Sequence, residues 1–359
     1  MSDVVKKPVD PAAIPRRRPR YPGKNPRRFH EKYKELDPAR YAADVQKVLD
    51  AGKTPAGMHR PIMVAEMLRC LRPQPGDVAV DCTLGGGGHA RAILERIQPG
   101  GRLIGLDVDP VELPRTEAAL RSAGFGPETF TAHHQNFAGL PKVLAAEGLA
   151  AVDLIVVDLG VSSMQLDNPD RGFSYKEVGP LDMRMNPSRG EPAARLVERI
   201  EEAKLARLLE DNADEPHALL IAGFLKRQPV DTSQALERVV RVGLNAALPA
   251  LTKSEVKISV RRTFQALRIA VNDELSVLDS LLRFLPHCLN PAGRVAILTF
   301  HSGEDRRVKK AFQAGHREGV YADVADEVIR STWEETRANR RATAAKLRWA
   351  VRAAAPGVG

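Results

Sequence analysis

A run of four glycines between two acidic residues is the feature of this sequence that most clearly predicts chemistry. Residues 80–89 read Val-Asp-Cys-Thr-Leu-Gly-Gly-Gly-Gly-His, and with Ala90 they satisfy the pattern G-x-G-x-x-A. Gly85 and Gly87 let a backbone turn pass close to a ligand. An acidic residue about 20 positions further on, here Asp107, can accept hydrogen bonds from both hydroxyls of a ribose. The segment therefore predicts a site for an adenosine-containing cofactor.

Asp81 favours one of the cofactor classes that are held in this way, because it places a carboxylate just before the turn. A dinucleotide brings a pyrophosphate, which binds best where carboxylates are absent. S-adenosyl-L-methionine brings a sulfonium cation and an amino group, and both favour a nearby carboxylate. We therefore predict S-adenosyl-L-methionine, and with it a methyltransferase. A nicotinamide-dependent dehydrogenase and a glycine turn without a ligand are the alternatives.

A second acidic residue ends another apolar run. Residues 153–158 read Asp-Leu-Ile-Val-Val-Asp and are followed by Gly-Val-Ser-Ser. In open α/β sheets, ligands bind outside the carboxyl ends of the strands. At such a position Asp158 can accept hydrogen bonds from an amine and orient it towards a methyl donor. The pattern predicts an amine as methyl acceptor; the alternative is an aspartate that only caps the turn.

Strands and helices alternate around these two sites, which is typical of a parallel sheet covered by helices. The spacing predicts helices at 62–71, 89–97, 113–123 and 140–147, and strands at 77–81, 102–107, 129–133 and 153–158. The fold class that follows is α/β, with a doubly wound, Rossmann-like sheet of the class I methyltransferase kind.

The alternation stops after residue 164. A loop rich in Asp, Pro, Gly and Arg leads into amphipathic helices, expected at 193–210, 215–227 and 232–247. The α/β pattern then returns, with a helix expected at 262–285, a strand at 294–300, a helix from about 305 and a final edge strand at 346–353. We predict three parts: a basic, Pro- and Arg-rich disordered arm at 1–57, a methyltransferase domain at 58–165 and 257–353, and an inserted helical substrate-recognition subdomain at 166–256.

The net charge of +9 is concentrated at the two ends of the chain. Residues 1–40 carry 12 Lys and Arg against 5 Asp and Glu, and residues 305–352 carry 12 against 7. Basic ends on a near-neutral body favour a nucleic-acid partner, although such ends can also serve solubility alone. Further candidates for phosphate binding are Arg171, Arg184, Arg261 and Arg262.

Other classes of site find no support in the sequence. The three cysteines, Cys70, Cys82 and Cys288, have no metal-ligand spacing and cannot form a disulfide framework. No run approaches the roughly 18 apolar residues that a membrane span needs, and the N-terminus lacks a signal-peptide pattern. We expect a cytoplasmic protein with no metal and no membrane contact, either a monomer or a homodimer.

Several motifs occur in a fixed order over residues 58–350. They are 59–63 (His-Arg-Pro-Ile-Met), 81–89, 106–110 (Leu-Asp-Val-Asp-Pro), 158–167, 171–175 (Arg-Gly-Phe-Ser-Tyr), 179–185 (Gly-Pro-Leu-Asp-Met-Arg-Met), 262–269, 272–275, 300–302 (Phe-His-Ser) and 346–348. Together they resemble the bacterial ribosomal RNA small subunit methyltransferase H family, which methylates N4 of a cytidine in 16S ribosomal RNA. The chain departs from the family pattern at 258–261 and at Gly303.

The resemblance implies which residues hold the cofactor: Gly87, Gly88 and His89 line it, Asp107 holds the ribose, Phe137 packs near the adenine, and Asp158 and Gln165 complete the pocket. Asp81 and Gly85 join this set from the glycine-turn argument. We expect Asp158, Ser162 and His301 to serve the reaction, since all three follow strand ends. A plainer interpretation of 302–305 is a helix-capping box formed by Ser302 and Asp305.

The substrate implied by the resemblance is a cytidine in the decoding region of 16S ribosomal RNA, within the small subunit. Its base must be flipped out, because a paired amine is tied up in the duplex. Two alternatives stay open: methylation of another RNA or DNA amine, and a non-catalytic ribosome-assembly factor with the same fold.

Overall fold

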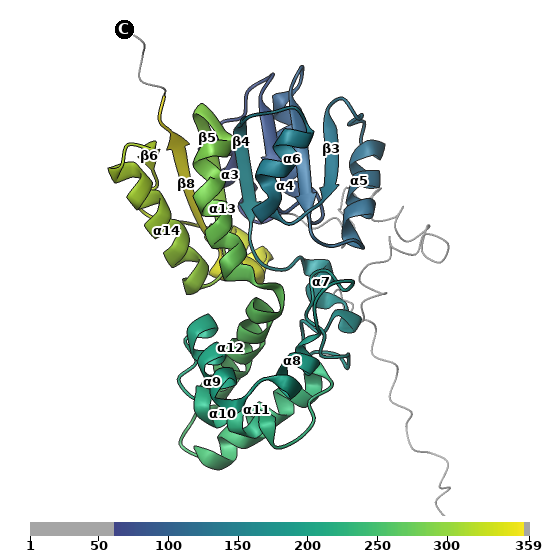
Figure 1. The fold of residues 1–359 in the computed structure, drawn as a ribbon, viewed down its shortest axis with the longest axis vertical. Helices are drawn as coiled ribbons and strands as arrows, with labels where there is room; N and C mark the ends of the chain where they lie inside the picture. Colours follow the sequence, from purple (N-terminus) through teal and green to yellow (C-terminus); the bar gives the residue numbers. More distant parts are fainter. Residues whose placement is uncertain (1–60, 355–359) are drawn as a thin grey trace, which may run out of the picture. The chain divides into compact units, whose positions relative to one another are not determined.

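The computed structural model describes residues 61–354, and these residues contain an eight-stranded sheet (Figure 1). Seven of the strands follow the order β3-β2-β1-β4-β5-β8-β6, and the eighth, β7, pairs with β8. The strands are β1 Val78–Asp81, β2 Arg102–Asp107, β3 Phe130–His134, β4 Val152–Asp158, β5 Leu289–Thr299, β6 Tyr321–Val324, β7 Ile329–Arg330 and β8 Lys346–Arg352. The first five run parallel. This confirms the predicted doubly wound α/β sheet.

The last strand lies elsewhere than the sequence predicts. A strand does form at 346–352, but the prediction that it lies at the edge of the sheet is wrong. This strand, β8, pairs antiparallel with β5 on one side and with β6 and β7 on the other. Its side chains at Leu347 and Ala350 are fully buried, as an interior strand requires. Strand order is not readable from a local apolar pattern, because such a pattern does not show which strands become neighbours.

The central strands are apolar throughout because both faces of the sheet are covered. In β4, Ile155 and Val157 join one buried cluster, while Leu154 and Val156 join the cluster on the opposite face. Successive strand side chains point to opposite faces, so this alternation follows directly from the run Leu-Ile-Val-Val.

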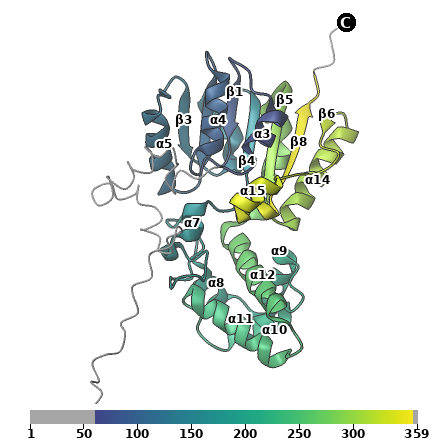
Figure 2. The ribbon, with the colours of Figure 1, turned by 180° about the vertical axis from the view of Figure 1, so that it is seen from behind.

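Two layers of helices supply those covers. One face carries α3 (Val64–Leu71), α4 (Gly88–Ile97) and α5 (Glu112–Ser122), which lie in front of the sheet in Figure 2. The other carries α6 (Leu140–Ala146), α13 (Glu274–Cys288) and α14 (Ser302–Arg317), in front in Figure 1. The chain changes face between neighbouring strands β1 and β4, so their carboxyl ends form the switch point of the sheet.

The segment between β4 and β5 is helical. It contains α7 (Ser163–Asp167), the 3-10 turn η3 (Pro169–Arg171), α8 (Ala193–Arg199), α9 (Glu202–Ala213), α10 (Ala218–Lys226), α11 (Ser233–Ala247) and α12 (Lys253–Asn272). Its apolar side chains form a separate buried cluster that runs from Phe173 to Leu267. The division into a domain at 58–165 and 257–353 and an insertion at 166–256 stays a prediction.

Two helices expected to be continuous are interrupted. The expected helix at 193–210 is wrong, because Ile200 and Glu201 take extended backbone and separate α8 from α9. The expected helix at 262–285 is also wrong: it is split at Asp273, which adopts a left-handed conformation (φ 51°) between α12 and α13. Aspartate tolerates this conformation better than most residues do, so an apolar period alone does not reveal the break.

The connections after α14 and β3 complete the described fold. They are the 3-10 turns η2 (Phe137–Gly139) and η4 (Arg340–Ala344) and the short helix α15 (Trp333–Ala338). The arm predicted at 1–57 lies outside the described residues, as does His59. Among the helices of residues 61–354, none has the length and apolar character that crossing a bilayer demands.

Candidate active site

The glycine turn leads from β1 into α4, and its geometry requires glycine at two positions. Gly87 precedes the helix with φ 73°, and a Cβ there would lie 2.7 Å from Thr116 Cγ2. A Cβ on Gly88 would lie 2.7 Å from Pro61 Cγ. Close packing on both sides therefore leaves no room for a side chain where the chain turns.

Asp107 fixes the turn against the end of β2. Its Oδ2 accepts a hydrogen bond from Gly85 N at 2.7 Å, and its Oδ1 accepts one from Asp109 N at 2.8 Å. Burial raises the pKa of this carboxyl, while those backbone donors oppose the rise. The Thr116 hydroxyl donates to Gly85 O and ties α5 to the same turn. The predicted ribose acceptor is thus already held in one orientation.

Asp81 and His89 lie beneath the turn. Asp81 is 1% exposed, its Oδ1 accepts from Thr83 N at 3.0 Å, and burial raises its pKa to about 6. Burial lowers the pKa of His89, whose Nε2 lies 2.9 Å from Ile62 O. A carbonyl can only accept, so the neutral ring carries its proton on Nε2 and presents the lone pair of Nδ1 to the pocket.

Asp158 stands at the end of β4, at the switch point, beside that lone pair. Its Oδ2 lies 3.7 Å from His89 Nδ1, and its backbone N–H donates to Thr83 Oγ1 at 2.6 Å. Oδ1 is buried and has no hydrogen-bond partner among the described residues. Burial, and after it the charge of Glu304, raises the pKa of Asp158 to about 7. A buried acceptor without a donor is costly, so this oxygen is suited to a donor brought by a ligand.

His301 lies at the end of β5 and caps α14. Its Nδ1 accepts from Gly303 N at 3.2 Å and Glu304 N at 3.4 Å, while its Nε2 lies 3.1 Å from Glu304 Oε1. The capping box expected from Ser302 and Asp305 is therefore wrong by one residue. His301 has extended backbone (φ −140°, ψ 167°), so the helix begins one residue earlier than that pattern implies.

Gln165 and Ser162 form a capping box at the start of α7. Ser162 Oγ accepts from Gln165 N at 3.1 Å, and Ser162 N donates to Gln165 Oε1 at 2.9 Å. These contacts account for both side chains structurally. Their predicted parts in catalysis and cofactor binding stay predictions, and so does the adenine contact of Phe137, which lies half-buried in η2 after β3.

Most of the chain matches a known protein family. The profile of the MraW methylase family matches residues 56–353. The chain belongs to the MraW methylase family. Membership confirms the resemblance drawn from the motifs and the predicted methyltransferase class.

Relatives of this MraW methylase match almost end to end. Ribosomal RNA small subunit methyltransferase H 2 of Alkaliphilus metalliredigens is 46% identical over 342 residues, which is 94% of this chain and 97% of the relative. Ribosomal RNA small subunit methyltransferase H 1 of Lachnoclostridium phytofermentans is 46% identical over 345 residues, 95% of this chain and 94% of that protein. The corresponding protein of Heliobacterium modesticaldum is 40% identical over 311 residues, 81% of this chain and 97% of its own length.

The structure adds a buried ion pair that sequence reasoning missed. Asp109 is fully buried, and its Oδ2 accepts from Gln165 Nε2 at 2.7 Å and from Arg171 Nη1 at 2.8 Å. Arg171 also donates to the carbonyls of Arg184 and Met185 at 3.0 and 2.8 Å. Asp109 thereby joins the end of β2 to the helical segment of this MraW methylase. The sequence shows the acidic residues at 107 and 109, but Arg171, the basic partner of Asp109, follows 62 residues after it.

Two of the arginines expected to bind phosphate are engaged within the protein. Arg171 is 9% exposed in the ion pair just described, so phosphate binding there is wrong. Arg184 makes two contacts with Asp182, at 2.7 and 2.8 Å. Arg261 is exposed and Arg262 half-buried on α12, and their role stays a prediction.

Sequence reasoning also missed a group of charged side chains that lies between His301 and α12. Arg268 holds both oxygens of Glu274 at 2.8 Å, and Glu304 is 2% exposed with its Oε2 accepting from Phe300 N at 2.8 Å. Burial raises the pKa of Glu304, but the hydrogen bond from His301 and the charge of Arg268 outweigh it and lower the pKa. Glu304 therefore stays ionised near Asp158.

Three possible metal ligands lie close together: one oxygen or nitrogen atom from each of Glu274, His301 and Glu304 is within 4.8 Å of the other two. Arg268 already provides the positive charge at this place, since it holds both oxygens of Glu274. A metal cation would have to displace or face that guanidinium. The arrangement thus suits a permanent ion pair.

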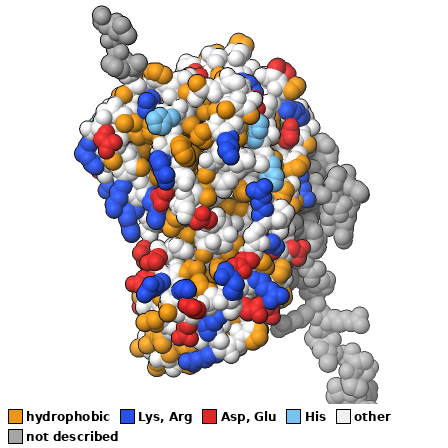
Figure 3. All heavy atoms as spheres, viewed as in Figure 1, with side chains coloured by type: hydrophobic (Ala, Val, Ile, Leu, Met, Phe, Trp, Pro, Cys, Tyr) orange, Lys and Arg blue, Asp and Glu red, His pale blue; other side chains and the backbone are white. Residues whose placement is uncertain are grey.

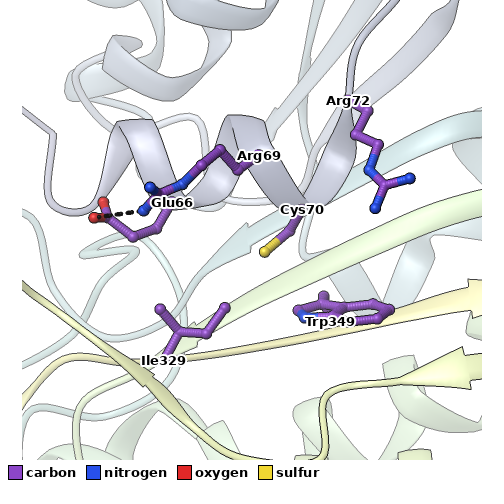
Figure 4. Close-up of a pocket in the computed structure, with 6 residues that line it drawn as sticks. All are labelled: Glu66, Arg69, Cys70, Arg72, Ile329 and Trp349. Carbon is purple, nitrogen blue, oxygen red and sulfur yellow. Dashed lines mark hydrogen bonds and ion pairs between the residues drawn. The ribbon is translucent and has the colours of Figure 1, made fainter.

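A cavity of about 230 Å³ lies apart from the residues of the site, between α3 and strands β7 and β8 (Figure 4). Its lining comprises Glu66, Arg69, Cys70, Arg72, Ile329 and Trp349. None of the residues predicted to bind the cofactor or serve the reaction lines it. The cofactor turn and this cavity are therefore separate features.

Proposed function

We propose that this chain is an S-adenosyl-L-methionine-dependent enzyme that methylates the N4 amine of a cytidine in 16S ribosomal RNA of the small subunit. The observation that carries the proposal is Asp158 at the switch point of the sheet, whose buried Oδ1 has no donor within residues 61–354. The names of the relatives, ribosomal RNA small subunit methyltransferase H, supply the class of substrate.

The residues around the turn fit S-adenosyl-L-methionine by their charge. The carboxyls of Asp81, Asp107 and Asp158 all have raised pKa values; Asp81 is buried and the other two are half-buried. The pKa of the basic group among them, His89, is lowered by burial. A cation is the ligand that lowers the cost of ionising such a group. In the proposed complex Asp107 holds the ribose, and the glycines at 85–88 let the cofactor approach the backbone. When bound, the cofactor supplies an electrophilic methyl group.

Asp158 then performs the proposed chemistry on the acceptor. Its Oδ1 accepts a hydrogen bond from the cytosine amine, which turns the nitrogen lone pair towards the methyl group. The N–C bond forms as the S–C bond breaks, and the nitrogen must lose one proton. Asp158, with a pKa of about 7, is matched to accept that proton near neutral pH. His89 flanks Oδ2 with a lone pair, so it can later accept a hydrogen bond from the protonated carboxyl.

The surface next to His301 suits a polyanion. On α14, Arg306, Lys309 and Lys310 are exposed, and basic side chains gather over this helix in Figure 3. Positive side chains of this kind bind phosphates and position an RNA without reading its sequence. The target cytidine must leave its stack to bring its amine to Asp158. We assign Ser162 and His301 to the side of the pocket that the base enters.

The proposal is tested with purified full-length protein, labelled S-adenosyl-L-methionine and small subunits that lack the modification. The expected result is methyl transfer to RNA, with N4-methylated cytidine as the product in nucleoside mass spectrometry. Cofactor binding without methyl transfer to small subunits would favour an assembly factor. A different methylated nucleoside would replace the proposed substrate by another amine.

A further inference from the structure

Trp333 is unusual among the aromatic side chains because it is 68% exposed, on the short helix α15. The second tryptophan of the sequence, Trp349, is half-buried in β8. An indole in water forfeits a large amount of favourable burial, and exposed tryptophan is enriched where a partner covers it. The position is therefore a candidate contact surface.

One arginine contacts this indole, and two more are close to it in the sequence. The guanidinium of Arg337 lies 5.3 Å from the ring centroid of Trp333 and steadies it from one side. Arg330 and Arg340 are exposed and form no ion pair within residues 61–354. Of the two acidic residues on α15, Glu335 is engaged by the backbone N–H of Met63 at 2.7 Å, which leaves Glu334 as the exposed one. The surface is aromatic and positive.

Two contacts attach this segment to opposite sides of the candidate active site. Glu335 accepts from Met63, the residue after Ile62, whose carbonyl orients His89. Arg341 donates to Asp167 Oδ1 at 2.6 Å, at the end of the helix that carries Gln165. Figure 2 shows α15 at the end of the sheet from which α7 leaves. A ligand on Trp333 would thus lie beside the entrance to the site.

We propose that Trp333, with Arg337, is a stacking platform for an unpaired nucleotide of the substrate RNA near the target cytidine; this rests on the function proposed above. Flipping a base out of its stack leaves neighbouring bases exposed, and an indole can stack on one of them. Arginines beside the ring can bind the adjoining phosphates. The platform raises affinity for RNA and takes no part in methyl transfer.

The surroundings of Trp333 favour RNA over a protein partner. Its neighbours Thr332 and Glu334 are exposed and polar, and the ring contact recorded within residues 61–354 is with the guanidinium of Arg337. A protein interface needs an apolar core around its anchor residue, with charges kept to the rim. A single aromatic ring among arginines is the arrangement that binds single-stranded nucleic acid.

Steady-state methyl transfer to unmodified small subunits tests the platform in the full-length protein. Trp333→Ala is expected to raise KM for the subunits about tenfold with kcat unchanged, and Trp333→Phe about threefold, because a smaller ring still stacks. The matched control is Arg96→Ala, which removes an exposed arginine in the last turn of α4, a helix that packs against β1 and β2; its KM should equal the wild-type value. An unchanged KM for Trp333→Ala would overturn the proposal.

Tryptophan fluorescence gives a readout that needs no catalysis. A short single-stranded RNA oligonucleotide should quench the wild-type emission, and Trp333→Phe should abolish most of that quenching. If the wild type transfers no methyl group yet shows this quenching, the proposed function fails and the platform stands. If methyl transfer proceeds but naked RNA causes no quenching and a ribosomal protein is required for the Trp333 effect, the platform for RNA is contradicted.

Discussion

At the cofactor end of the site, side chains are fixed by hydrogen bonds to nearby backbone, whereas at the substrate end the helical segment after β4 is attached to the rest of the fold by ion pairs between distant elements. Asp107 is held by the amides of Gly85 and Asp109, all within 25 residues of one another. By contrast, Asp109 is paired with Arg171, and Asp167 with Arg341 174 positions away. The first arrangement survives as long as the turn folds. The second depends on the correct packing of the whole chain.

This difference separates binding of the cofactor from shaping of the substrate pocket. Backbone N–H donors do not titrate, so the contacts that fix the cofactor turn depend on pH only through the Asp107 carboxyl. The ion pairs join the helical segment to the sheet, so substitutions there should act on stability and RNA binding together. Four predictions, in descending order of expected effect, test the distinction.

Loss of the buried ion pair should cost the most stability. Arg171→Ala leaves Asp109 charged, buried and short of a donor, and breaking such a pair costs about 3–5 kcal/mol. Urea unfolding should show this loss. The control is Arg195→Ala, which removes a pair whose side chains are 69% and 67% exposed and should leave stability nearly unchanged. Equal losses of stability in the two variants would show that the buried ion pair stabilises the fold no more than the exposed one does.

A substitution in the glycine turn should weaken binding of the cofactor. Gly87→Ala places a Cβ 2.7 Å from Thr116 Cγ2 at a φ of 73°, so it should weaken S-adenosyl-L-methionine binding about 10- to 100-fold in calorimetry. Adding Thr116→Ser removes that methyl group but keeps the hydroxyl that bonds to Gly85. The double variant should recover part of the loss. No recovery would mean that backbone strain alone determines the effect.

The ionised carboxylate of Asp158 should lower the free energy of unfolding, although the proposed reaction needs it. Its pKa is raised to about 7 on folding, so the folded state binds a proton more readily than the unfolded chain, and stability is lost as pH rises from about 4 to 7. Asp158→Asn removes this cost and should stabilise the cofactor-free protein at pH 8 by about 1–2 kcal/mol. At pH 4 the two proteins should unfold alike, as thermal melts at both pH values would show. A destabilised variant at pH 8 would contradict the assigned pKa.

Glu304 should give the smallest effect, a shift of a pH profile. Its negative charge contributes to the raised pKa of Asp158, alongside burial, while His89 and Asp81 face the same region from α4 and β1. Glu304→Gln keeps an acceptor for Phe300 N but removes the charge. The acid limb of the methyl-transfer rate should therefore move to lower pH by less than about one unit. A shift to higher pH would show that Glu304 acts in another way.

The cofactor end was predictable from sequence and much of the substrate end was not. Gly85, Gly87 and Asp107 lie in a strand–turn–helix pattern whose spacing dictates their contacts. The pairing of Asp109 with Arg171, and of Asp305 with Arg348, depends on which strands and helices become neighbours. A one-residue difference in helix start also changed the cap from Ser302 to His301, since side-chain types fitted both frames.

The central claim is that Asp158 accepts the proton of the target amine, and single-turnover methyl transfer across pH tests it most directly. For the wild type, the rate should fall about tenfold per pH unit below the pKa of Asp158 in the cofactor complex, which the bound cation lowers from about 7 in the cofactor-free protein. Asp158→Asn should bind cofactor but react at least about 100-fold more slowly, with no acid limb. An Asp158→Asn protein that kept the wild-type rate, or the wild-type dependence on pH, would contradict the account.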